Sequence, residues 1–164
     1  IPFYDVYNNL IAVSGRALET NDKTVRYITI RTTDSEEKLV FGMDRLNVHE
    51  PVKVVEGPID SLFLTNCVAS GDANLAIVSN NISAGKKVLI FDNEPRNKEI
   101  VKRLESIIDK GYNVVIWDNT FKGKDINEMI LNGADAEHIK IIIDRRTYKG
   151  MEARVELMNW RKCE

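Results

Sequence analysis

Cysteine is scarce in this sequence, and its two copies lie far apart. Cys67 and Cys163 form no Cys-x-x-Cys pair. A zinc-ligand set or a disulfide framework needs several cysteines at suitable spacings. The sequence therefore excludes both within these 164 residues, and it fits a reducing cytoplasm.

Long hydrophobic runs and an excess of one charge are also missing. No apolar run approaches the roughly 18 residues that span a bilayer, and the opening IPFYDVYNNL lacks the regions of a signal peptide. The formal net charge is −2, so the chain has no basic excess to attract nucleic acid non-specifically. We expect no membrane attachment, and any phosphate binding should be local or carried by metal ions.

Apolar residues, in contrast, are sufficient for one sizeable core. They make up 43% of the chain, and no low-complexity tract or Gly/Ser linker interrupts it. A disordered or fibrous protein is thereby excluded. The chain begins at Ile1 instead of methionine, which suggests a shortened polypeptide from which upstream modules are missing.

The spacing pattern of apolar residues divides the chain into three parts. Residues 1–50 contain short alternating segments that predict hairpins in a small mixed α+β subdomain. Residues 51–133 alternate short apolar strands with amphipathic helices, which predicts an α/β fold with a parallel sheet covered on both faces. The chain after Asp125 predicts two or three further helices, and residues 134–164 are expected to form a C-terminal helical extension. A helix is also expected from about Pro95 to Lys110.

Three of the predicted parallel strands end in an acid. VKVV is followed by Glu56, KVLIF by Asp92 and NVVIW by Asp118. The carboxyl ends of such strands share the edge where open α/β sheets bind ligands. Asp92 and Glu94 would leave the same face if their strand continued through Asn93.

Carboxylates that lie close together repel, so without a counter-cation at least one should have a raised pKa. A hard divalent cation removes this conflict, and these positions offer neither histidine nor thiolate. Such ligands favour Mg²⁺, for which Mn²⁺ can substitute, and they favour phosphate chemistry.

A purely structural explanation exists for each acidic motif. EGPID could be a Gly turn before a helix with proline at its first position, and DNEPR could be a capped helix start. In GKDINE, a capping box from Asp125 to Glu128 explains both acids. Lys124 and Asn127 need a further explanation.

Taken together, VVEGPIDSL, FDNE and GKDINE resemble the Toprim domain of bacterial-type primases, topoisomerases and several nucleases. The family pattern of an acid-Gly-x-x-Asp turn and a later acid pair corresponds here to Glu56 with Asp60, and to Asp92 with Glu94. Many members have Asp where this chain has Glu94.

The N-terminal part is similar to the segment before Toprim in DnaG-type primases, where a Gly-Arg pair and a basic-Tyr pair line the polymerising site. Arg16 and Arg26 occupy these positions, although Arg26 replaces the usual lysine. A tighter resemblance, through EGPIDSLF, DNEPR and the later WD and KD, is to the primases of T-even-type bacteriophages.

The resemblance implies a DNA primase core that synthesises short RNA primers on single-stranded DNA from ribonucleoside triphosphates, by two-metal phosphoryl transfer. It implies metal ligands at Glu56, Asp92, Glu94 and Asp125, a catalytic or orienting role for Asp60, triphosphate or template contacts at Arg16, Arg26 and Lys124, and weaker candidates at Asp118 and Asn127. Glu56 could also accept the proton of the attacking 3′-hydroxyl. A replicative helicase partner, an upstream zinc-binding module and, if a phage encodes the chain, a bacterial host cytoplasm are implied as well.

Two other functions remain open. A Toprim nuclease of DNA repair or RNA maturation would use the same acids, but it has no evident need for the GRAL and RYITI segments. A non-catalytic DNA-binding module predicts that the metal acids are missing. Two further groups could touch DNA or instead belong to the surface and the core: the basic Lys140, Arg145, Arg146 and Lys149, and the aromatic Trp117, Phe121 and Trp160.

Overall fold

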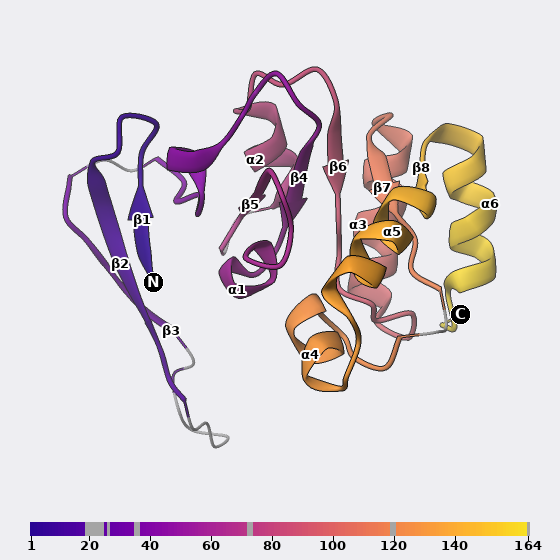
Figure 1. The fold of residues 1–164 in the computed structure, drawn as a ribbon. Coiled ribbons are helices and arrows are strands. Elements are labelled where there is room, and N and C mark those ends of the chain that lie inside the picture. The colour runs from indigo at the N-terminus through magenta and orange to yellow at the C-terminus, as the bar shows by residue number, and fades with distance from the viewer. Residues whose placement is uncertain (19–24, 26, 35–36, 72–73, 119–120, 164) are drawn as a thin grey trace.

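Two β-sheets organise the computed structural model, which describes residues 1–18, 25, 27–34, 37–71, 74–118 and 121–163 (Figure 1). The first sheet is antiparallel, in the order β1-β2-β3. Its strands are β1 (Pro2–Tyr4), β2 (Leu10–Arg16) and β3 (Tyr27–Arg31). The hairpins expected in the N-terminal part are therefore confirmed.

The second sheet has five strands in the order β5-β4-β6-β7-β8, and only β8 runs antiparallel to its neighbour. Its strands are β4 (Val52–Val55), β5 (Cys67–Ala69), β6 (Lys87–Leu89), β7 (Asn113–Val115) and β8 (Thr147–Tyr148). Because helices cover both faces, the central strands are continuous apolar runs, and this confirms the predicted α/β architecture.

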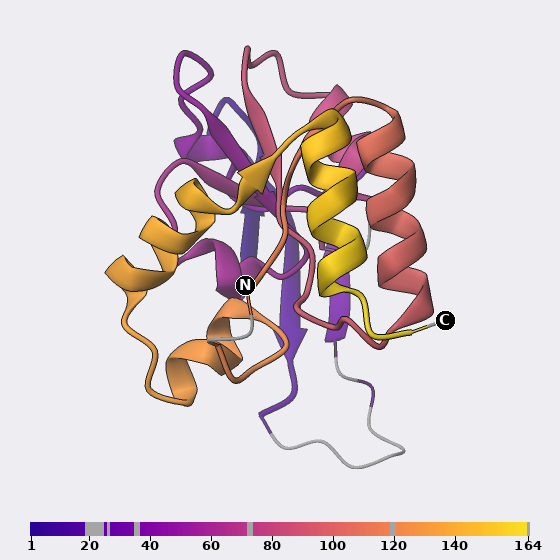
Figure 2. The ribbon, with the colours of Figure 1, turned by 90° about the vertical axis from the view of Figure 1, so that its right-hand side faces the viewer.

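Six α-helices and one short 3₁₀ segment (Met43–Arg45) surround the sheets within the described residues. They are α1 (Pro58–Ser61), α2 (Leu75–Asn80), α3 (Lys98–Asp109), α4 (Ile126–Leu131), α5 (Ala136–Arg145) and α6 (Gly150–Trp160). Figure 2 shows α3 and α6 side by side on one side of the five-stranded sheet and α5 on the other. None of these helices is long and apolar enough to cross a bilayer.

Two expected boundaries were wrong. The helix expected from Pro95 begins only at Lys98, because the side chain of Asn97 accepts a hydrogen bond from the backbone N–H of Glu99 (3.0 Å) and caps it. The strand predicted as KVLIF ends at Leu89 instead of Phe91, so the continuation through Asn93 that would have placed Asp92 and Glu94 on one face is not present.

The C-terminal segment is also more than a set of helices. Its β8 extends the sheet by pairing with β7, and α6 packs against α3. A two-residue strand has no alternation that sequence patterns could detect. The division of the chain near residues 50 and 133 stays a prediction.

Both tryptophans belong to the core, as the structural alternative expected. Trp117 and Trp160 are buried. The indole N–H of Trp117 donates to the carbonyl of Phe91 (2.8 Å), and that of Trp160 donates to the side chain of Asn93 (3.2 Å). Each buried ring thus has a partner for its one polar group.

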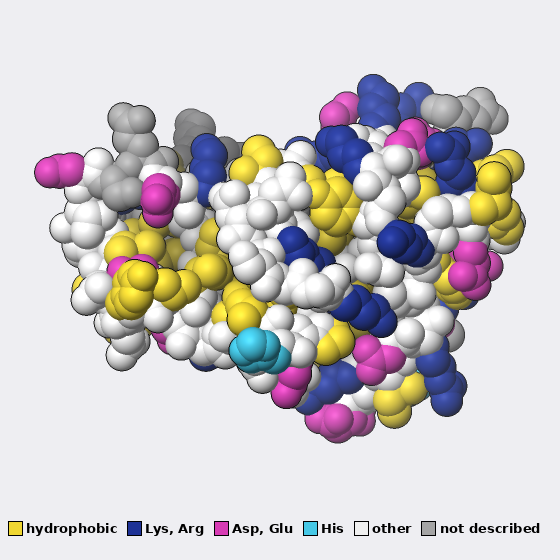
Figure 3. All heavy atoms as spheres, turned by 90° about the horizontal axis from the view of Figure 1, so that it is seen from above, with side chains coloured by type: hydrophobic (Ala, Val, Ile, Leu, Met, Phe, Trp, Pro, Cys, Tyr) yellow, Lys and Arg dark blue, Asp and Glu magenta, His cyan; other side chains and the backbone are white. Residues whose placement is uncertain are grey.

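The three-stranded sheet has two unlike faces. Ser14 pairs with Thr29 on the face toward the rest of the chain, whereas Val13 pairs with Ile30 on the opposite face. Val13 is 42% exposed and Ile30 68%. Seen from above (Figure 3), hydrophobic side chains show at the surface over this sheet on the left, and Lys and Arg side chains are spread over the other part.

Candidate active site

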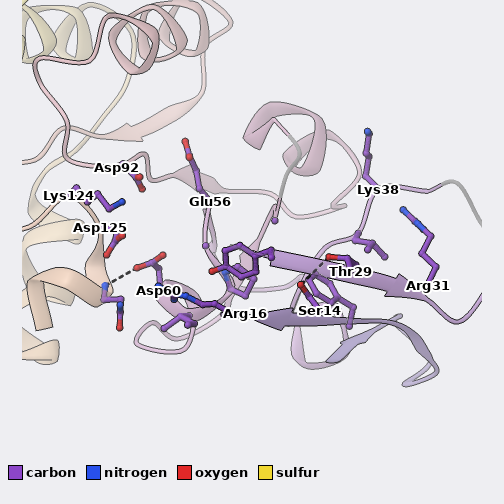
Figure 4. Close-up of a pocket in the computed structure, with 18 residues that line it drawn as sticks. Ser14, Arg16, Thr29, Arg31, Lys38, Glu56, Asp60, Asp92, Lys124 and Asp125 are labelled. Atoms are coloured by element: carbon purple, nitrogen blue, oxygen red, sulfur yellow. Dashed lines mark hydrogen bonds between the residues drawn. The ribbon is translucent and has the colours of Figure 1, made fainter. Parts of the chain in front are cut away.

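A cavity of about 640 Å³ lies between the two sheets and is lined by residues of both (Figure 4). Four acids and four cations take part in its lining: Glu56, Asp60, Asp92 and Asp125, with Arg16, Arg31, Lys38 and Lys124. The acids and Lys124 gather at one end, whereas Arg31 and Lys38 lie at the other (Figure 4). Opposite charges therefore share one hollow along its length.

Glu56 directly follows β4, and Gly57 then turns the chain into α1, which has Pro58 at its first position. Burial raises the pKa of the Glu56 carboxyl above its usual value, and nearby Asp60 and Glu94 add to this, whereas the guanidinium of Arg103 opposes it. The Nη1 atom of Arg103 lies 3.8 Å from Oε1 of Glu56. The turn that the structural alternative expected is thus present, and it places an acid at the cavity.

Asp60 lies on α1 and is held by the first turn of α4. Its Oδ1 accepts a hydrogen bond from the backbone N–H of Asn127 (2.8 Å). A Cβ atom at Gly57 would lie 2.2 Å from Oδ2 of Asp60, so the carboxylate rests directly over that glycine. Burial raises its pKa to about 6, with Asp125 contributing, although the bond from Asn127 lowers it.

Asp92 lies in the irregular segment after β6. Its pKa is raised to about 7, first by burial and then by the neighbouring charges of Glu56 and Asp125. The next residue, Asn93, donates its backbone N–H to the carbonyl of Lys124 (2.5 Å) and so ties this loop to the loop before α4. The direction agrees with the expectation for clustered acids, although burial contributes more than the neighbouring charges.

Asp125 caps α4, as the structural alternative expected. Its Oδ1 accepts from the backbone N–H of Glu128 (2.7 Å), and the Glu128 carboxylate accepts from the N–H of Lys124 (2.6 Å). Gly123 precedes them with φ +139, and an added Cβ would lie 2.8 Å from the backbone nitrogen of Met129. Only glycine fits there, and the resulting turn brings Lys124 and Asp125 to the cavity.

Two predicted residues lie elsewhere. Glu94 and Asp118 line a second hollow, of about 580 Å³, on the other side of the Asn93 loop. Because β6 ends early, Glu94 does not leave the same face as Asp92; its Oε2 accepts from the Asn97 side chain (3.3 Å). Its charge still contributes to the raised pKa of Asp92.

The opposite wall of the cavity comes from β2 and β3. Arg16 lies 5.7 Å from the ring centre of Tyr27, and the hydroxyl of Thr29 donates to that of Ser14 (3.0 Å). Arg26, the predicted partner of Arg16, lies outside the described residues.

The sequence reasoning missed the lining residues Ser14, Thr29, Arg31, Lys38 and the nearby Arg103. The alternation of β2 and β3 carried part of the signal, but the strand register needed to combine them was unknown. No local pattern pointed to Arg103.

Two of the four residues in the basic cluster of the C-terminal segment, Lys140 and Arg146, make local contacts. Lys140 pairs with Glu137 (2.6 Å), and Arg146 pairs with Glu156 (3.2 Å) while its guanidinium lies 5.2 Å from the ring centre of Tyr148. These contacts favour a structural role for both cations.

No three or more His, Cys, Asp or Glu side chains among the described residues are arranged as a ready metal-binding group. The cavity nevertheless supplies carboxylates without histidine or cysteine. Burial, followed by the charges of neighbouring acids, raises the pKa values of Glu56, Asp60 and Asp92, so the charged form of these three carboxyl groups is disfavoured. This donor set fits a hard divalent cation.

Known proteins resemble this chain in sequence and in fold. No family model matches the chain. The chain is 34% identical to the DNA primase of Enterobacteria phage T4 over 99% of its own length and 47% of that protein. Among solved structures, the Aquifex aeolicus primase (zinc binding and RNA polymerase domains) matches 97% of the chain and 43% of its own, with TM-score 0.66 and 21% identity.

The primase fragment of the bacteriophage T7 primase-helicase protein matches 85% of this chain and 60% of its own, with TM-score 0.61 and 22% identity. The chain thus spans about half the length of the phage T4 protein that it resembles, and its fold is that of primase catalytic cores.

Proposed function

We propose that this chain, with the fold of primase cores and a sequence similar to a phage DNA primase, is the polymerising core of a DNA primase. It would synthesise short RNA primers on single-stranded DNA from ribonucleoside triphosphates. The observation that carries the proposal is the cavity in which partly buried acids with raised pKa values share one space with cations of the three-stranded sheet.

We assign divalent cation binding, by Mg²⁺ or Mn²⁺, to Glu56, Asp92 and Asp125, with Glu94 joining from the neighbouring hollow. Such ions, when bound, would stabilise the charge on the attacking oxygen and on the leaving phosphate. The acids would hold these ions in place, and Glu56 would accept the proton of the attacking 3′-hydroxyl. Asp60, fixed by the backbone of Asn127, orients the cluster.

Arg16 and Lys124 are our candidates for triphosphate or template contacts, and Arg26 joins them by resemblance. Arg31 and Lys38 extend the positive charge along the cavity, away from the acids. A guanidinium above a tyrosine ring is held in direction, so Arg16 is suited to a phosphate at a fixed place.

The phage T7 and Aquifex proteins suggest what would accompany this core. One is a primase-helicase, and the other contains a zinc-binding domain. We propose a replicative helicase and an upstream zinc-binding module as partners of this chain, in the cytoplasm of a bacterial host.

A Toprim nuclease or a non-catalytic DNA-binding module is less favoured. The matched relative is a primase, and so are the two matched structures described above. The N-terminal sheet also contributes one wall of the cavity, including Arg16 and Thr29, which a nuclease would leave unexplained.

Primer synthesis can be tested directly with the chain, single-stranded DNA, labelled ribonucleoside triphosphates and Mg²⁺ or Mn²⁺. We expect short RNA from the parent and none from Glu56→Gln. Glu99→Gln is the matched control, because the Glu99 carboxylate is exposed on α3 and pairs with neighbouring Lys102. Shortened DNA without new RNA would identify a nuclease instead.

A further inference from the structure

Glu56 has a cationic partner that the proposed chemistry does not use. Among the described residues it is the one acid of the cavity with an ion-pair contact, to Arg103 of α3. The helix that carries Arg103 is firmly anchored by a buried apolar face: Ile100, Val101, Leu104, Ile107 and Ile108. Arg103 therefore approaches Glu56 from a fixed base.

The contact lies at the border between two hollows. Glu56 lines the main cavity and also a smaller hollow of about 270 Å³, whereas Arg103 lines only the smaller one, together with Ser70 and Phe91. About 53% of the Arg103 side chain and 29% of the Glu56 side chain are exposed, so water can reach the pair. The Glu56 side chain thus borders both hollows.

In this structure Glu56 is turned away from two of the other acids. Figure 4 shows Asp60 and Asp125 directed toward one another, while the Glu56 side chain extends away from both. Consistent with this, no described acids form a ready metal-binding group. The direction of the Glu56 side chain coincides with its contact to Arg103.

We propose that Arg103 is a positioning residue that holds Glu56 while the cavity has no cation, and that Glu56 exchanges Arg103 for the cation when one binds. The proposal rests on the proposed function in taking the acidic end of the cavity as a divalent cation site. Arg103 and the cation then compete for the Glu56 carboxylate. Arg103 therefore weakens cation binding and keeps Glu56 apart from the other acids until a cation binds.

The competition should be modest, because a partly exposed ion pair at 3.8 Å is weak. We expect Arg103→Gln to tighten Mn²⁺ binding by about two- to fivefold. A simple loss of positive charge near the site would act in the same direction, so the single variant does not distinguish exchange from a general field effect.

A double-mutant cycle makes that distinction. Mn²⁺ affinity is measured by electron paramagnetic resonance or calorimetry for the parent, Arg103→Gln, Glu56→Gln and the double variant. If Arg103 acts through Glu56, Arg103→Gln tightens binding in the parent and has no effect in the Glu56→Gln background. An equal effect in both backgrounds, or none in the parent, overturns the proposal.

Lys102→Gln is the matched control, since Lys102 neighbours Arg103 on α3 but pairs with exposed Glu99. It should leave Mn²⁺ affinity unchanged, and thermal unfolding verifies that every variant is folded. A parent that binds no Mn²⁺ overturns both the metal site of the proposed function and the exchange. A parent that binds Mn²⁺ without coupling overturns the exchange alone.

Discussion

The two sheets differ in how far the side chains on their faces are buried. The central strands of the five-stranded sheet are buried on both faces, and Val52, Val54 and Val114 are fully enclosed. The three-stranded sheet directs polar side chains such as Ser14 toward the cavity and leaves Ile28 and Ile30 exposed on its outer face. The five-stranded sheet, called the frame below, is a closely packed core, and the three-stranded sheet, called the wall, has a polar lining toward the cavity.

This difference explains where each kind of charge lies. Parallel strands bring their carboxyl ends to one edge, so Glu56 and Asp92 meet although they are distant in sequence. Paired antiparallel strands instead place alternate residues in a row, as the register of Arg16 with Tyr27 and of Ser14 with Thr29 does here. The frame concentrates acids, and the wall distributes polar and cationic groups.

Removal of an acid from the frame should have the largest effect. We expect Asp92→Asn to lower primer synthesis by about a thousandfold, because it removes a carboxylate from the place where phosphate charge must be balanced. The measurement is the initial rate of RNA synthesis on single-stranded DNA. Asp109→Asn, at the exposed end of α3, is the control and should retain the parent rate. A variant that keeps a tenth of the activity would remove Asp92 from the proposed site.

The same Val→Ala truncation should lower the free energy of unfolding by different amounts in the two sheets. Val54→Ala, at a fully buried position of β4, should lower the free energy of unfolding by about 2 kcal/mol because it leaves a cavity. Val13→Ala, on the exposed face of β2, should cost less than about 1 kcal/mol. Urea titrations of both variants test the contrast. Equal losses would show that the outer face of the three-stranded sheet is as closely packed as the frame.

The frame was also the part that the sequence predicted best. Buried parallel strands are apolar runs, so β4, β6 and β7 could be predicted from the order of apolar residues in the sequence. The acids that follow these runs could be identified in the same way. The predictions that were wrong in this part of the chain depended on a single helix cap or on a very short strand pairing. Asn97 delays the start of α3, and the two residues of β8 are held by β7 and not by any pattern of their own.

The wall was predicted only as hairpins. Which residues face the cavity depends on the register that pairs Ala12 with Arg31 and Ser14 with Thr29, and a sequence does not state this register. The contact between Arg103 and Glu56 is likewise created by tertiary packing. Glu94 was paired with Asp92 through the acid-pair motif, and it would share a face with Asp92 only if the strand continued through Asn93, whereas β6 ends at Leu89.

Removal of a cation from the wall should affect binding more than chemistry. We expect Arg16→Ala to raise KM for ribonucleoside triphosphates by about ten- to a hundredfold, the loss typical of a hydrogen bond to a charged group, with a smaller change in kcat. Arg154→Ala, which removes an exposed arginine paired with Asp109, is the control. An unchanged KM would assign Arg16 to support of the Tyr27 ring instead.

The smallest effect should be the pH dependence of the free energy of unfolding that the acids of the frame cause when no metal ion is bound. Asp60 and Asp92 have pKa values of about 6 and 7, above those of unfolded aspartate near 4. Between about pH 4 and pH 7 the folded protein therefore holds more protons than the unfolded chain, so its free energy of unfolding falls as pH rises. Asp92→Asn removes one of these groups.

We accordingly expect Asp92→Asn to gain about 1 to 2 kcal/mol of stability relative to the parent between pH 5 and pH 8 in a chelator, a gain limited by the partial exposure of the side chain to water. Urea titrations at each pH measure it, and saturating Mg²⁺ should abolish it because the cation then balances the carboxylates. A difference that stays constant across this range would mean that the acids are already balanced by the cations of the wall.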